Sequence, residues 1–300
     1  MTAPKSLAAS VKARLLTLAR SRGETFNDLL TRYGIERLLY RLGRSKHADR
    51  FLLKGAMLFA LWDDRMPRPT RDVDLLAFGS TDAEDVVARF REIVRTEAEP
   101  DGLEFDADTV SAEELRDDEA YRGLRVKLIA RLGKADIPLQ IDLGTGDAVT
   151  PGPVDADFPT LLDFPAPHVQ AYPIYTVVAE KFEAMVSLGV RNTRMKDFFD
   201  VRFLAGRFAF DGTTLHKAIR ATFERRKTEL SVSPFPLSND FASDPEKQTQ
   251  WTAFLHRNAL EKGQASFPNV IRDIRDFIIP ALSGSPGVWA PDKRWIADRR

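Results

Sequence analysis

A chain of 300 residues, 43% of them hydrophobic, can bury a sizeable core and exceeds the usual size of a single domain. It has no cysteine, which excludes disulfides, thiolate nucleophiles and cysteine-based zinc sites and is compatible with a reducing cytoplasm. No apolar run is long enough to span a bilayer and the N-terminus has no apolar secretory stretch, so we expect a cytoplasmic protein without a membrane partner.

The formal net charge is zero, but the charges are unevenly distributed along the chain. Residues 1–54 hold 12 Lys or Arg and 4 Asp or Glu, whereas residues 72–119 hold 4 Arg and 17 acidic residues. Such an asymmetry can mark a nucleic-acid-binding surface, and solvated helix faces explain it equally well. The candidates for contact with a phosphate backbone are Arg37, Arg41, Arg44 and Lys46.

Two helices and a strand are predicted near the N-terminus. Apolar residues recur with helical spacing over residues 7–19 and 27–42, and residues 51–53 form a short apolar strand. The strand runs into Lys54 and Gly55, after which a helical pattern follows. Because glycine lets the backbone approach a ligand and the first amides of a helix attract anions, this turn is a candidate phosphate site. An ordinary tight turn also explains Gly55 taken alone.

The next predicted strand carries two carboxylates on one face. Side chains alternate along a strand, so Asp72 and Asp74 point the same way while Val73 and Leu75 face a core. Two neighbouring like charges are costly, and Mg²⁺, which prefers carboxylate oxygens and nucleotide phosphates, is the usual remedy. The alternative is the polar face of an edge strand, on which both acids lie in water beside Arg71.

Further along, Thr81 or Asp82 can cap a helix that reaches Val94, and an acidic connection follows. Residues 124–130 and 139–143 read as two strands joined by a hairpin-length connection, so the sheet is expected to be mixed. The proline-containing stretch over residues 150–173 reads as an extended loop or linker.

A third carboxylate lies on the polar face of the strand at 139–143. Asp142 can there meet Asp72 and Asp74 on a neighbouring strand, and three acids would allow two metal ions about 3.5–4 Å apart for in-line phosphoryl transfer. Asp142 could also take the proton of an attacking hydroxyl, and an exposed acid at a hairpin end is the alternative. Asp147 is a less favoured substitute as the third metal ligand.

Two helices beyond residue 173 hold further candidates. In the helix at 176–188, Lys181 falls in the middle of the apolar arc, where its ammonium must reach water or an anion such as a nucleotide phosphate, or snorkel. The next helix, capped by Asn192 or Thr193, holds Asp197 and Asp200 in its first turns. A pair with Lys196 explains Asp200 structurally, which leaves Asp197 as the acid open to a functional role.

Five motifs in this order resemble the AbiEii/AbiGii toxin family, nucleotidyltransferase-like toxins of type IV toxin–antitoxin and phage-defence systems that are related to the mycobacterial MenT toxins. The similarity covers roughly residues 25–280 and is carried by these segments: Lys54-Gly55, RPTRDVDLL at 68–76, QIDLGTGD at 140–147, AEKFEA at 179–184 and NTRMKDFFD at 192–200.

The resemblance implies an α+β fold of the DNA polymerase beta superfamily, in which a nucleotidyltransferase-like mixed β-sheet has flanking helices and a mostly helical C-terminal half follows. We expect a basic helical region at 1–54, the nucleotidyltransferase core at 55–150, a helical region at 151–282 and a tail at 283–300. The superfamily's phosphate turn carries Gly-Ser or Gly-Gly where this chain has Gly55-Ala56, so backbone amides are left to bind phosphate.

Residue by residue, the resemblance implies metal binding by Asp72 and Asp74, phosphate contact by Lys181 and a functional acid at Asp197. It leaves open whether Asp142 is a metal ligand. The predicted nucleotide contacts are Lys54, Gly55, Arg71 and Lys181.

The expected activity is that of a Mg²⁺- or Mn²⁺-dependent toxin that moves a nucleoside monophosphate from an NTP to an acceptor. By resemblance the acceptor is a tRNA 3′ end, whose modification blocks translation, and the functional partner is an AbiEi-like antitoxin. The alternatives are a nucleotidyltransferase acting on a protein or small molecule, a nucleotide-binding regulator without turnover, and a metal-dependent phosphohydrolase.

Overall fold

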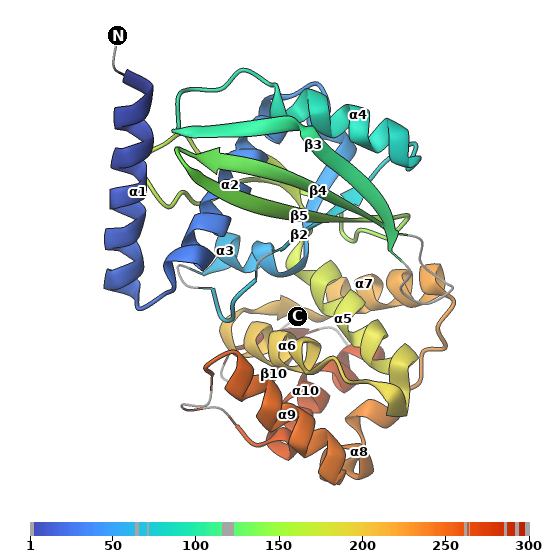
Figure 1. Ribbon diagram of the computed structural model, residues 1–300. Helices are drawn as coiled ribbons and strands as arrows, with labels where there is room; N and C mark the ends of the chain where they lie inside the picture. The colour runs from blue at the N-terminus through green and yellow to red at the C-terminus, as the bar shows by residue number, and fades with distance from the viewer. Residues whose placement is uncertain are drawn as a thin grey trace. The chain divides into compact units, whose positions relative to one another are not determined.

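The computed structural model describes residues 3–63, 66–70, 72–115, 123–260, 263, 265–284, 287–291 and 294–297. The chain forms two compact units, which are coloured along the sequence in Figure 1. The first unit contains residues 1–146 and 154–172, and the second contains residues 147–153 and 173–300. Each unit is therefore built from two separate stretches of the chain.

The first unit contains a mixed β-sheet with helices packed on it. Its helices are α1 (Ala3–Arg22), α2 (Phe26–Arg44), α3 (Phe59–Trp62) and α4 (Ala83–Val94). Its strands are β1 (Phe51–Lys54), β2 (Asp72–Ala77), β3 (Leu103–Leu115), β4 (Gly123–Leu132), β5 (Ala135–Thr145), β6 (Val154–Asp157) and β7 (His168–Ala171). Within the described residues they form one sheet in the order β3-β4-β5-β2-β1-β7-β6, in which β2–β5 and β1–β7 are parallel. The predicted mixed sheet is confirmed.

Alternation along the strands separates an apolar face from a polar face. Val73 and Leu75 of β2 are buried, while Asp72 and Asp74 on the opposite face are half-buried. Helices α2 and α4 cover the apolar face, where Figure 1 shows them lying along the sheet. Helix α2 lies close to the sheet, since a Cβ built on Gly34 would lie 3.0 Å from a methyl carbon of Leu139 of β5. The polar face is thus the one that carries the candidate site.

Helix starts follow the expected capping chemistry. The hydroxyl of Thr25 accepts a hydrogen bond from the Asp28 amide at the start of α2. At the start of α4 the cap is Asp82 rather than Thr81, because the Asp82 carboxylate accepts from the amide of Glu84 at 2.9 Å.

Three strands of the first unit lie where no strand is predicted. The acidic connection after α4 is β3, an edge strand on which only Leu103 and Val110 are buried, so its alternation is too weak to read. The proline-containing stretch contains β6 and β7, which are four residues long each. Their place is set by pairing rather than by a local pattern, since β7 pairs with β1, which is distant in sequence, and β6 pairs with β7.

The second unit is mostly helical, as predicted. Its helices are α5 (Ile174–Leu188), α6 (Met195–Arg207), α7 (Gly212–Arg226), α8 (Asn239–Ser243), α9 (Pro245–Arg257) and α10 (Phe267–Leu282). Aromatic rings fill its core, for example Phe198 stacked on Phe241 with centroids 5.7 Å apart. The C-terminal stretch is ordered at β9 (Gly287–Ala290) and β10 (Arg294–Ala297), which form a small sheet with β8 (Phe210–Asp211). Trp289 anchors this sheet, since its ring is buried and donates to the carbonyl of Ala205 at 2.7 Å.

No helix in the described parts of the chain combines the length and the apolar character that a membrane span requires.

Candidate active site

A row of charged residues crosses the polar face of the sheet in the first unit. Strand register aligns one residue from each of five neighbouring strands, with the signs plus, minus, minus, plus and minus. In order across the sheet they are Lys54, Asp74, Asp142, Arg125 and Glu113. Asp72 lies one row away, opposite Gln140. Because like charges on neighbouring strands repel, Asp74 and Asp142 need a cation nearby.

The two acids of β2 are held by different neighbours. Thr70 donates its hydroxyl to Asp72 at 2.8 Å. Gly55 begins the 3-10 turn that follows β1, and its φ of 71° lies in the left-handed region that favours glycine. A Cβ at this position would lie 1.9 Å from Oδ2 of Asp74, so the turn approaches the carboxylate as closely as only glycine permits.

We expect Gly55→Ala to disturb Asp74 as well as the turn. The positive φ alone should cost about 1–3 kcal/mol of unfolding free energy, and the clash with the carboxylate adds to it. Gly23→Ala is a matched control, because Gly23 has a φ of 69° but no atom within 4 Å of the added Cβ. Urea unfolding of both variants separates the two contributions, and equal losses would mean that contact with Asp74 does not constrain this position.

Asp142 is engaged by Arg125 of β4. Nε and Nη2 of Arg125 donate to the two carboxylate oxygens of Asp142, both at 2.8 Å. With the Gln140 amide turned to face the guanidinium, its oxygen accepts from the same two nitrogens at 3.0 and 3.1 Å. The hydrogen bond with Asp142 raises the pKa of Arg125 above its usual value, and the negative charge of Asp72 contributes in the same direction.

The donor set suits a hard cation held by two carboxylates. Among the described residues, no group of three or more His, Cys, Asp or Glu is arranged to hold a metal ion. Asp72 and Asp74 on one strand face still fit Mg²⁺, which takes its other ligands from water and phosphate oxygens. Asp147, the alternative third acid, is buried in the second unit with the Arg226 guanidinium 3.1 Å away. Arg71 lies outside the described residues.

The second unit holds a buried ion cluster around Lys181. Its ammonium lies 3.0 Å from Asp197 and 2.6 Å from Asp200, and both carboxylates are fully buried. Arg194 adds a bond from Nε to Asp197 at 2.7 Å. Burial raises the pKa of Asp197, but the charges of Lys181 and Arg194 outweigh it and bring the pKa to about 2. Asp197 is therefore an anion at neutral pH rather than a proton donor.

These contacts correct two details of the sequence interpretation. Lys196 is exposed, and the ammonium that pairs with Asp200 is that of Lys181 on α5. The N-cap of α6 is Arg194, whose amide donates to the side chain of Asn192 at 2.7 Å, rather than Asn192 or Thr193 themselves. The anions that meet Lys181 on its apolar arc are thus the protein's own carboxylates, a pairing between helices that no local spacing reveals.

A second buried cluster went unpredicted. Arg226 at the end of α7 contacts three acids, with Glu183 at 2.7 Å, Asp147 at 3.1 Å and Glu180 at 3.4 Å. A helical wheel places Glu183 on the polar face of α5, yet its side chain is buried because α7 packs there. The sequence signal was the acid pair three residues apart, which gives no hint of its partner.

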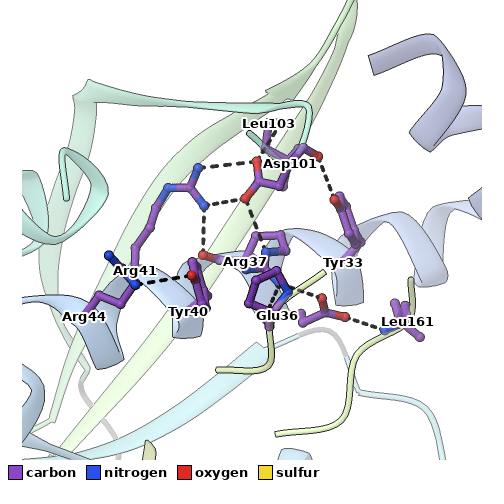
Figure 2. A network of polar contacts seen from close by, with 10 residues as sticks. Tyr33, Glu36, Arg37, Tyr40, Arg41, Arg44, Asp101, Leu103 and Leu161 are labelled. Atoms are coloured by element: carbon purple, nitrogen blue, oxygen red, sulfur yellow. Dashed lines mark hydrogen bonds and ion pairs between the residues drawn. The ribbon is translucent and has the colours of Figure 1, made fainter. Parts of the chain in front are cut away.

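The predicted nucleic-acid contacts divide into buried and exposed residues. Figure 2 shows Arg37 and Arg41 of α2 directed at Asp101, with guanidinium to carboxylate distances of 3.2 and 2.7 Å. Arg37 is 0% exposed and Arg41 is 7% exposed, so their predicted contact with a phosphate backbone is wrong. They neutralise a buried acid instead. Arg44 and Lys46 are exposed, and for them nucleic-acid binding stays a prediction.

Glu36 completes the network in Figure 2. Its carboxylate accepts from the Leu161 amide at 2.7 Å and lies 3.2 Å from Nη1 of Arg37. Arg37 also donates to the carbonyl of Pro165, so α2 holds the segment between β6 and β7. Burial raises the pKa of Glu36 to about 7, against the lowering effects of the Leu161 amide and Arg37.

Stability is expected to fall as this carboxyl ionises. Because the folded chain binds the Glu36 proton more tightly than the unfolded chain does, the contribution is complete below pH 4.5 and is lost as the pH rises through about 7. The loss amounts to at most about 3 kcal/mol. Urea unfolding at about pH 5 and about pH 8 measures it, with Glu36→Gln as the variant that should lack this change. A variant as sensitive to pH as the wild type would contradict the assignment to Glu36.

Comparison with known proteins identifies the family. No curated protein matches the chain. Among solved structures, JHP933 from Helicobacter pylori is similar with 14% sequence identity and a TM-score of 0.47, over 82% of this chain and 90% of that one. A proposed nucleotidyltransferase from H. pylori matches with 14% identity and a TM-score of 0.46, over 82% of this chain and 92% of that one. The family described as nucleotidyl transferase AbiEii toxin, type IV TA system, matches residues 37–273. The chain therefore belongs to the AbiEii family of nucleotidyl transferase toxins of type IV toxin–antitoxin systems.

Proposed function

We propose that this toxin transfers a nucleoside monophosphate from an NTP to the 3′ end of a tRNA, in a reaction that depends on Mg²⁺ and blocks translation. The observation that carries the proposal is the pair Asp72 and Asp74 on one face of β2, beside the glycine turn that follows β1. In a member of this family, two hard carboxylates next to a turn of backbone amides are suited to a metal-bound triphosphate.

The reaction joins the acceptor oxygen to the α-phosphorus as the bond to pyrophosphate breaks. Asp72 and Asp74 would hold the ion, and the amides that follow Gly55 would bind phosphate oxygens in place of the missing serine hydroxyl. When bound, Mg²⁺ supplies positive charge to the phosphoryl oxygens on which negative charge develops. The proton of the acceptor hydroxyl would leave to a base, a role for which Asp142 is the candidate predicted from the sequence. Family resemblance assigns phosphate contact to Lys181 and a supporting acid to Asp197.

The tRNA acceptor is inferred from resemblance to the related MenT toxins and from the basic N-terminal region. Arg44 and Lys46 are the exposed cations at the end of α2 that we assign to the RNA backbone. Lys46 already lies 2.9 Å from Glu92, an exposed pair that contributes little and is easily exchanged for a phosphate. The NTP and the tRNA would be met in the cytoplasm, where an AbiEi-like antitoxin opposes the toxin.

Incubation of the purified protein with Mg²⁺, total tRNA and each α-labelled NTP in turn tests the proposal. We expect label in tRNA and one pyrophosphate per transfer, no label with EDTA, and none in tRNA whose 3′ diol has been oxidised with periodate. Label in protein would indicate a different acceptor. NTP binding without pyrophosphate would indicate a regulator, and free NMP without a labelled acceptor would indicate a hydrolase.

A further inference from the structure

We propose that Arg125 acts as a fixed cation that occupies Asp142, so that the site takes one divalent ion, held by Asp72 and Asp74, rather than two. This inference rests on the proposed nucleotidyltransferase function. It assigns Arg125 a positioning role that the motifs of the family resemblance do not include.

Both carboxylate oxygens of Asp142 are engaged by Arg125. Oδ1 and Oδ2 each accept a hydrogen bond from Arg125 at 2.8 Å, the bidentate arrangement in which a guanidinium matches a carboxylate best. Gln140 fixes the guanidinium from the side, with its amide oxygen 3.0 and 3.1 Å from the same nitrogens. A metal ion on the remaining lone pairs of Asp142 would lie close to the Arg125 guanidinium and would be repelled by its positive charge.

The row of charged residues explains why Arg125 pairs with Asp142 rather than with Glu113. Arg125 has an acid on either side in the row, Asp142 on β5 and Glu113 on β3. Glu113 is bound by Lys127, whose ammonium lies 2.6 Å from its carboxylate. Arg125 therefore pairs toward the middle of the sheet, where Asp74 and Asp142 face each other.

The Arg125 guanidinium supplies at this point the positive charge that a second metal ion would supply. Two-metal sites use shared carboxylates to hold a pair of cations about 3.5–4 Å apart. Here the described residues contain no group of three acids arranged for metal binding, and Asp142 already has a partner that stays charged at all accessible pH values. The remaining acids, Asp72 and Asp74, suffice for a single Mg²⁺ that keeps several waters.

Manganese binding measures the number of ions directly. We would titrate the full-length protein with Mn²⁺ in the presence of a non-hydrolysable α,β-methylene NTP and count bound ions by electron paramagnetic resonance. One Mn²⁺ per chain is expected for the wild type. Asp74→Asn should weaken this binding by at least about tenfold, since it removes a ligand charge.

Replacing Arg125 and Asp142 together tests whether Asp142 is an acid that Arg125 neutralises or a ligand of the metal ion. Arg125→Gln combined with Asp142→Asn removes one charge of each sign and keeps the net charge, so Mn²⁺ affinity should equal that of the wild type. Arg125→Gln alone exposes the Asp142 charge and should admit a second Mn²⁺ or tighten the first. Circular dichroism melting checks that each variant is folded.

Two outcomes overturn the inference while leaving the proposed function intact. One is a wild type that binds two Mn²⁺ ions, a result that needs no variant to fold. The other is a double variant that loses Mn²⁺ affinity as severely as Asp74→Asn, which would make Asp142 a ligand. A wild type that binds no Mn²⁺ overturns the metal-dependent function and this inference together.

Discussion

Replacement of Asp74 by asparagine should abolish nucleotide transfer and leave the protein folded. Asparagine keeps the shape of the side chain at a half-buried position of β2, and it removes the charge on which the proposed Mg²⁺ site depends. Loss of a ligand charge should lower transfer by at least about a hundredfold. The measurement is incorporation of labelled nucleotide into the acceptor, with a thermal melt of the same sample.

Asp136→Asn provides the matched control for this prediction. Asp136 is an exposed acid of β5 that pairs with Arg131 at 3.1 Å and lies outside the charge row. Its replacement should leave transfer unchanged. If Asp74→Asn retained the labelling rate of this control, Asp74 would not belong to the catalytic site.

Replacement of Arg37 by methionine is expected to have the largest effect on stability. Methionine fills similar volume, but Glu36 and Asp101 then lose a buried guanidinium that contacts both carboxylates. Removing one member of a buried charge network should lower the free energy of unfolding by about 3–5 kcal/mol. Urea unfolding measures it, and any accompanying loss of RNA binding would be a consequence of unfolding.

The control for Arg37 lies on the same helix. Arg44→Met removes an exposed guanidinium near the end of α2 and should change stability little. The double variant Arg37→Met with Glu36→Gln should recover part of the loss, because it also removes a carboxylate that would be left uncompensated. If Arg37→Met were as stable as Arg44→Met, the buried network around Arg37 would contribute nothing to the stability of the fold.

Local periodicity predicts part of the candidate site. The alternation in β2 places Asp72 and Asp74 on one face without any knowledge of the other strands. The alternation in β5 does the same for Asp142. These three positions follow from side-chain direction alone, which a sequence encodes directly.

The pairing partners could not be predicted, because they depend on strand order and helix packing. Arg125 meets Asp142 only because β4 lies beside β5 in this sheet, and Lys181 meets Asp197 only because α5 packs on α6. Arg37 and Arg41 count as polar in any helical pattern, yet they are buried because Asp101, distant in sequence, compensates their charge. A charged residue in a helical pattern therefore indicates an exposed position only where no residue distant in sequence compensates its charge.

The chain passes between the two units more than once, which limits how the protein can be divided into fragments. The chain passes from the first unit to the second after residue 146, returns at 154 and leaves again after 172. A fragment that stops near residue 146 would lack β6 and β7 and would expose the edge of β1, the strand that leads into the glycine turn. No single cleavage or gene fusion point can therefore yield both units intact, and exchange of one unit between relatives would require three coordinated junctions, after residues 146, 153 and 172.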